Sequence, residues 1–167
     1  PYVSIGTNFG ISQKKGFTFG YEVTAGALNS VKYHLKLSIG KKYIIGKGAA
    51  IFNKSALKES TKMNYFSIGG GLGILGCETG LVKMVSNQGK KYIGRRSNVY
   101  IGGFNLPVAV LLNPLTSVGV LPTSFYSLEK YSFKQEKYFN HNLWQKFTMT
   151  TDGCIACSDE EYFERKK

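Results

Sequence analysis

Apolar and polar side chains alternate through much of residues 2–104, and this two-residue period constrains the fold more than any other feature. Between Phe17 and Ala27 every odd position is apolar, and the odd positions between Val31 and Ile39 are apolar again. Successive side chains of a β-strand point to opposite faces, so this alternation is typical of strands with one apolar and one polar face. The sequence therefore predicts an all-β protein.

The two segments are expected to form an antiparallel hairpin, because directly opposed residues share a face of the sheet. A three-residue connection at 28–30 places Val23 opposite Leu35 and Glu22 beside Lys36. A slip of one residue would turn every apolar side chain to the other face. The predicted register is therefore this one or one displaced by two residues. Within it, placing a lysine at Glu22 is expected to destabilise the hairpin modestly.

Further strands are expected at residues 2–12, 43–52, 63–75, 79–85 and 91–104, and then at 106–112, 116–121, 125–133 and 144–151. Their connections are short and carry Gly, Lys, Asn or Ser, which favours neighbouring hairpins. We expect an antiparallel meander that closes into a barrel, or else a β-sandwich or jelly roll. The longest uncharged run, residues 97–128, contains Pro107, Pro114 and Pro122, so it cannot form one membrane-spanning helix.

Charge divides the chain into two parts. Residues 1–128 contain 15 Lys and Arg against three acids, whereas residues 129–167 contain seven of each. We therefore expect a basic antiparallel β domain at 1–128 and a polar, charge-neutral C-terminal extension at 129–167. A basic surface suits an anionic partner such as lipid headgroups, nucleic acid or acidic glycans. It equally suits a solvated surface in which lysines protect strand ends. Because the first residue is Pro1, a processed product or a fragment is expected.

Two groups of residues are candidate binding sites. Lys90, Lys91, Arg95 and Arg96 combine cations with nearby aromatic residues, a composition that can bind anions; the alternative is a cationic hairpin turn. Cys154, Cys157 and His141 are the candidate metal ligands. A structural zinc site needs a further ligand at defined spacing, and a disulfide or two free thiols explain the cysteines as well. No metal is therefore expected.

No arrangement of residues indicates catalysis. Neither His34 nor His141 has a nucleophile or a carboxylate at a readable spacing. The few acids of residues 1–128 do not form a general acid and base pair. The glycines at 71–76 match the spacing of a dinucleotide fingerprint, but no acid follows at the distance that the ribose requires. We expect no enzyme, no catalytic residue and no cofactor.

Three segments resemble the strands of small outer-membrane β-barrel proteins: GFTFGYEVTAG at 16–26, YFSIGGGLG at 65–73 and VYIGGF at 99–104. Those barrels alternate lipid-facing apolar residues with inward polar residues or glycine, and they carry aromatic residues near both interfaces. The resemblance covers about residues 2–104. It implies a non-catalytic structural or interaction protein of the cell envelope or outer membrane. Its apolar sheet face would contact membrane lipid or neighbouring protein subunits.

Two other functions fit the same pattern. A structural subunit of a virion coat or another large assembly would bury its apolar strips on neighbouring copies. A basic module could instead bind nucleic acid or a glycan through its surface cations. In all three cases the protein functions through binding and not through catalysis. As an envelope barrel or as a coat subunit, it is expected to be part of an assembly. Dependence on detergent separates the membrane protein from the other two.

Overall fold

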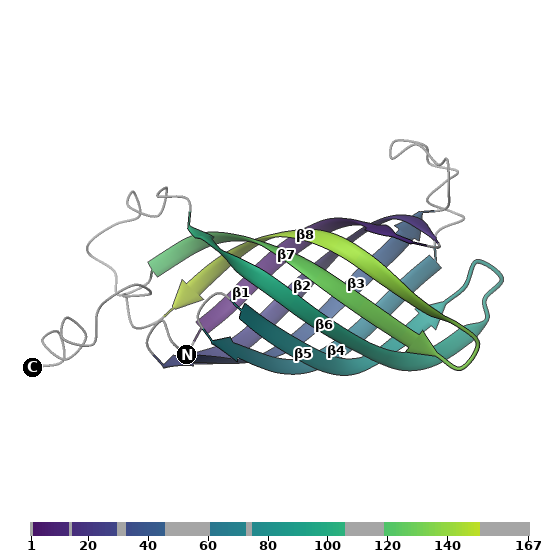
Figure 1. The fold of residues 1–167 in the computed structure, drawn as a ribbon, viewed down its shortest axis with the longest axis horizontal. Helices are drawn as coiled ribbons and strands as arrows, with labels where there is room; N and C mark the ends of the chain where they lie inside the picture. The colour runs from purple at the N-terminus through teal and green to yellow at the C-terminus, as the bar shows by residue number, and fades with distance from the viewer. Residues whose placement is uncertain are drawn as a thin grey trace, which may run out of the picture.

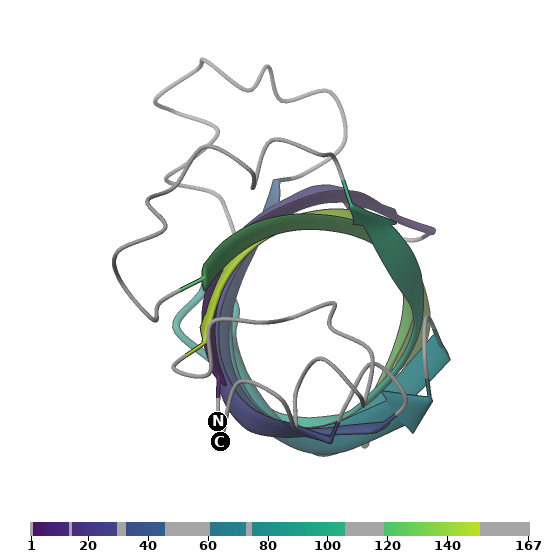
Figure 2. The ribbon, with the colours of Figure 1, turned by 90° about the vertical axis from the view of Figure 1, so that its left-hand side faces the viewer.

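Eight strands form one closed antiparallel barrel, in which each strand pairs with the next along the chain and β8 pairs with β1 (Figure 1). The computed structural model describes residues 2–13, 15–29, 33–45, 61–72, 75–105 and 119–150. Seen from the end, the strands form a continuous ring (Figure 2). The expected all-β meander and its closure into a barrel are confirmed. The strands are β1 (Tyr2–Ser12), β2 (Gly16–Asn29), β3 (Tyr33–Ile45), β4 (Thr61–Leu72), β5 (Leu75–Val85), β6 (Lys91–Asn105), β7 (Gly119–Phe133) and β8 (Lys137–Thr150).

The two ends of the barrel differ in the connections that they carry. The β1–β2, β5–β6 and β7–β8 hairpins turn at one end, which we call the turn end. Tyr2 and Thr150 pair at the opposite end, which we call the terminal end. Among the described residues, no helix is long and apolar enough to cross a membrane.

Side-chain alternation decides which residues face the inside of the barrel. On β1, Ser4 and Asn8 are buried while Ile5 and Phe9 are exposed, and the same alternation continues around the ring. Most polar and charged groups of the strands therefore lie inside, together with an apolar cluster near one end, and large apolar groups also cover the outer wall. This is the reverse of the arrangement in a water-soluble domain, where apolar side chains fill the core.

The hairpin of β2 and β3 has the predicted parity and a different register. Val23 lies opposite Ile39, four positions beyond the Leu35 that we predicted, and Glu22 lies opposite Gly40. The prediction that Glu22 sits beside Lys36 is therefore wrong, although both side chains are buried inside the barrel. The hydrophobic pattern excludes odd displacements only, and the position of the turn decides among the even ones. Asn29 pairs with Tyr33, so β2 continues two residues beyond the predicted end at Ala27, and β3 begins two residues after the predicted start at Val31.

Two predicted strands, 31–39 and 43–52, share one strand in their described parts, since residues 33–39 and 43–45 both belong to β3; residues 31–32 and 46–52 lie outside the described residues. Lys41 and Lys42 lie within β3 and not in a turn. The sequence Gly40-Lys41-Lys42 has the composition of a turn, but Gly40 is needed for close packing against a neighbouring strand. The predicted strand at 106–112 lies outside the described residues.

The change in composition at residue 129 falls inside β7. Beyond it, β8 pairs along its whole length with β7 and from Asn140 to Thr150 with β1. Residues 129–150 therefore complete the same barrel as the basic part of the chain. Their acids include Glu129, whose carboxylate lies inside the barrel among cations of the earlier strands.

Candidate functional site

Among the described residues, seven charged side chains are buried inside the barrel and form one connected cluster, which we call the interior ion cluster. Each is the inward-facing member of its local alternation, so the strands bring them together from distant parts of the chain. Three are carboxylates and four are cations. They are Glu22 on β2, Lys36 and Lys42 on β3, Glu78 on β5, Arg96 on β6, Glu129 on β7 and Lys146 on β8.

Arg96 occupies the centre of this cluster. Its Nη1 lies 2.5 Å from Glu78 Oε1, and its Nη2 lies 2.7 Å from Glu129 Oε1. Nη1 also donates a hydrogen bond to Ser67 Oγ at 3.0 Å, and the guanidinium carbon lies 4.1 Å from the centre of the Tyr65 ring. A guanidinium presents several donors in one plane, which suits a position between two carboxylates. Arg96 therefore links its own strand, β6, to β4, β5 and β7.

The three lysines complete the pairing of the carboxylates. Lys146 forms an ion pair with Glu22, and Lys42 forms one with Glu129. Lys36 Nζ lies 3.1 Å from Glu78 Oε2. Removing charges from water is costly, and close opposite charges with further hydrogen bonds offset that cost. Each carboxylate of the cluster thus contacts at least two cations, since Arg96 Nη2 also lies 3.7 Å from Glu22 Oε2.

An apolar and aromatic cluster fills the interior between the ion cluster and the turn end. Most of its members face inward near the turn end of their strands, whereas Trp144 lies in the middle of β8, and several rings stack on one another. Tyr131 and Tyr138 stack with ring centres 5.3 Å apart, and the Tyr138 hydroxyl lies 3.2 Å from Met63 Sδ. The space inside the ring of Figure 2 is therefore occupied by side chains. The cluster comprises Ile44, Met63, Tyr65, Val82, Met84, Tyr131, Phe133, Tyr138 and Trp144.

Inward-facing glycines make room for aromatic rings on the neighbouring strand. Gly40 lies opposite Tyr65, and a Cβ at Gly40 would come within 2.2 Å of that ring. The Tyr65 hydroxyl in turn donates a hydrogen bond to Glu22 Oε2 at 2.9 Å. Covering a strand glycine with a cross-strand aromatic ring is a recurring way to stabilise it. The same arrangement pairs Gly26 with Tyr2, Gly76 with Tyr100 and Gly94 with Phe133.

The predicted anion-binding residues separate in the structure. Lys90 and Lys91 are exposed at the β5–β6 turn, and Arg95 is exposed on the outer wall. Arg96 is fully buried and belongs to the interior ion cluster. Adjacent residues of a strand face opposite sides, so Arg95 and Arg96 cannot bind the same external group.

Of the three predicted metal ligands, only His141 belongs to the part of the chain that the structure describes. His141 lies on the outer wall, where its Nδ1 is hydrogen-bonded to the Tyr126 hydroxyl. Cys154 and Cys157 lie outside the described residues. Within the residues that the structure covers, no three His, Cys, Asp or Glu side chains are placed to hold a metal ion.

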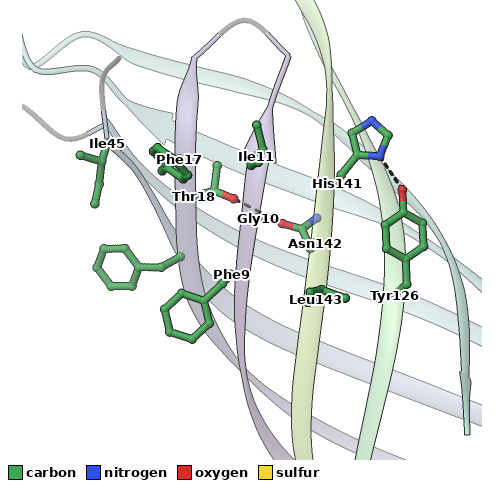
Figure 3. A pocket seen from close by; sticks show the side chains of 11 residues that line it. Phe9, Gly10, Ile11, Phe17, Thr18, Ile45, Tyr126, His141, Asn142 and Leu143 are labelled. Atoms are coloured by element: carbon green, nitrogen blue, oxygen red, sulfur yellow. Dashed lines mark hydrogen bonds between the residues drawn. The ribbon is translucent and has the colours of Figure 1, made fainter. Parts of the chain in front are cut away.

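The outer wall carries an open apolar hollow of about 760 Å³ near the turn end, where β1, β2 and β8 meet (Figure 3). Phe9, Ile11, Phe17 and Leu143 border it. Behind them, Gly10 has Thr18 and Asn142 on its two sides, and these two side chains are hydrogen-bonded at 3.3 Å. Asn142 also accepts a hydrogen bond from Lys42, so this part of the wall is joined to the interior ion cluster.

Sequence comparison does not assign the chain to a family. No protein-family model matches it, and no curated protein matches it significantly. Among solved structures, the chain is similar to the N-terminal β-barrel domain of Pseudomonas aeruginosa OprF, with 12% sequence identity and a TM-score of 0.48. The match covers 88% of this chain and 96% of that domain. The closed barrel of this chain itself confirms the barrel fold that the resemblance implied.

Proposed function

We propose that this protein is a membrane β-barrel of the cell envelope, of the outer-membrane type, that serves as a closed structural anchor. The observation that carries the proposal is the apolar outer wall. Leu35, Leu143 and Ile93 expose 70%, 67% and 74% of their surfaces, and other large apolar residues surround them. A continuous apolar surface of this extent is unfavourable in water and suits contact with lipid or with another protein.

The dimensions of the barrel support contact with a bilayer. Its strands contain between 11 and 15 residues, and a tilted strand of about 9–11 residues crosses the hydrocarbon layer. The closed ring also pairs the backbone groups of every strand with those of two neighbours. A closed barrel is the form in which β-structure can meet lipid, because it leaves no unpaired strand edge.

The filled interior supports an anchor and not a wide pore. Arg96, Lys42, Glu129 and Tyr131 are fully buried, and their ion pairs and ring contacts link opposite parts of the wall. A small eight-stranded barrel has an interior just wide enough to be filled by its own side chains. We therefore expect ion conductance far below that of porins with water-filled channels.

Refolding into lipid vesicles tests this proposal. The unfolded chain, diluted from urea, is expected to fold only when vesicles or detergent micelles are present. The folded form should migrate differently from the boiled form on a gel, and planar bilayers should record little conductance. A monodisperse folded protein in plain buffer would contradict the membrane location. A conductance as large as that of a porin would contradict the closed interior.

A further inference from the structure

In the part of the chain that the structure covers, the cations of the outer wall all lie at one end of the barrel. We call these seven residues the outer cation belt: Lys41, Lys62, Lys83, Lys91, Arg95, Lys130 and Lys137. Each of the strands β3 to β8 contributes one or two of them, within a few residues of the turn end. Among the described side chains, the outer wall of the terminal end carries no charge, and residues such as Leu35, Leu75 and Phe147 form it.

Strand pairing places these cations beside one another. Asn64 on β4 pairs with Lys41 on β3 and with Lys83 on β5, so the two lysines lie in one row across these three strands. Strands that are two apart are separated by about 10 Å. Lys62 and Lys91 both lie opposite Val85, in the adjacent row. These four cations thus share one face of the wall across β3 to β6, and Arg95 and Lys137, which both lie opposite Ser132, continue it to β8.

The described carboxylates do not neutralise this surface. Glu22, Glu78 and Glu129 are buried inside the barrel. Glu136, the remaining carboxylate in the described part of the chain, forms an ion pair with Lys15 at the β7–β8 turn. No described carboxylate therefore offsets the positive charge of the belt, which can attract a partner of opposite charge at the point where the apolar wall ends.

Aromatic rings lie at the same level as the cations. Lys41 Nζ is 5.4 Å from the centre of the Tyr43 ring, and Lys130 Nζ is 5.9 Å from that of Phe139. Tyr43 also stacks on Phe19, with ring centres 4.9 Å apart. Aromatic residues with one apolar and one polar side are enriched at the membrane–water interface, and they mark its depth on a barrel wall.

We propose that the outer cation belt binds anionic lipid headgroups and thereby directs the turn end of the barrel to the more anionic surface of the membrane. This inference rests on the proposed membrane function. The belt lies directly beside the apolar wall, just as the charged headgroup of a lipid lies directly beside its acyl chains. A lipid can therefore contact both surfaces at once. Each cation close to an anionic bilayer surface gains about 1 kcal/mol, so several acting together give a clear preference.

Spin-labelled lipids can test the belt in reconstituted barrels. The measurement is the fraction of phosphatidylglycerol, compared with phosphatidylcholine, that the barrel holds in a motionally restricted shell. We expect a preference for phosphatidylglycerol of about fivefold, the factor that 1 kcal/mol represents. The preference should fall towards one in a variant with K41Q, K62Q, K83Q and R95Q. It should also fall in high salt, which screens exposed charges.

Two controls separate charge from other effects. A variant with K41R, K62R, K83R and R95K keeps every charge and should keep the preference. A K90Q and K134Q variant removes two exposed turn cations outside the belt and should change the preference little. Equal binding of both lipids by the unmodified barrel would refute the proposal that the belt binds anionic headgroups. An undiminished preference in the glutamine variant would refute it as well. If neither lipid is restricted, the membrane function itself fails.

Discussion

Arg96 and Glu129 lie on the neighbouring strands β6 and β7 and form a buried ion pair, with Arg96 Nη2 2.7 Å from Glu129 Oε1. The same guanidinium contacts Glu78 through its other terminal nitrogen. Arg96 Nη2 also lies 3.7 Å from Glu22 Oε2, so Arg96 is the shared partner of three carboxylates that have little access to water. Charges in such positions depend on one another, because an unpaired buried charge costs far more than an unpaired surface charge.

The substitution Arg96→Met is expected to lower the free energy of unfolding by about 3–5 kcal/mol, since it leaves buried carboxylates without their shared partner. The measurement is urea unfolding of the barrel in lipid vesicles. Arg95→Met is the matched control. Arg95 is the next residue along the strand and points outward, so its loss should change stability by only about 0.5 kcal/mol. Equal effects of the two substitutions would contradict the interior position of Arg96.

Glu22 is the only carboxylate of the ion cluster that pairs with Lys146. Glu22→Gln should destabilise the barrel by about 3 kcal/mol, because it leaves a buried ammonium group without its carboxylate partner. Glu22→Lys should prevent folding, since it places a fifth cation among the existing four with two carboxylates left. This differs from the modest effect that the predicted hairpin register implied. A folding yield in vesicles shows the difference, and a folded Glu22→Lys barrel of near-normal stability would refute the pairing.

Gly40 allows the Tyr65 ring to lie against β3 and reach Glu22. Gly40→Ala should cost about 1–3 kcal/mol, because the new methyl group must displace the ring from a tightly packed position. In a Tyr65→Ala background the same substitution should cost much less, since the obstructing ring is gone. Unfolding measurements on the four proteins of this double-mutant cycle give the coupling between the two sites. A coupling near zero would show that Tyr65 is not the obstacle.

The sequence predicted the architecture because the alternation is a local property. The bounds of β1 were predicted as observed, and β2 and β6 were predicted within two residues at each end. Where glycine and lysine occur together, as at Gly40 and Lys41, composition indicated a turn inside a strand. A glycine followed by lysines can form a turn, or it can lie in a strand where a neighbouring strand packs closely against it. The sequence does not distinguish the two until the neighbouring strand is known.

The ion cluster was not predicted, because its members come from six strands and pair across the barrel. Lys42 was assigned to a turn, Arg96 to an external anion site and Glu129 to a separate extension. The parity of β6 could have revealed Arg96: Gly94, Asn98 and Tyr100 share its face, whereas Ile93 and Val99 share the face of Arg95. Which carboxylate each cation meets depends on how the strands are staggered around the ring. The sequence pattern alone does not determine that stagger.

The depth of a lysine on the outer wall gives a direct test of lipid contact. Ile39 lies at the middle of β3 and exposes 65% of its surface, whereas Ile93 lies near the turn end, opposite Lys83. In a bilayer, Ile39→Lys should cost about 2–4 kcal/mol and Ile93→Lys about 0–1 kcal/mol, because the penalty for a charge falls from the midplane to the interface. In water both side chains would already be solvated, and neither substitution would be costly. Urea unfolding in vesicles measures both variants under the same conditions. Equal and small effects would show that this wall does not face lipid. If a partner protein covered the wall, both lysines would lower the free energy of unfolding, with no dependence on their depth.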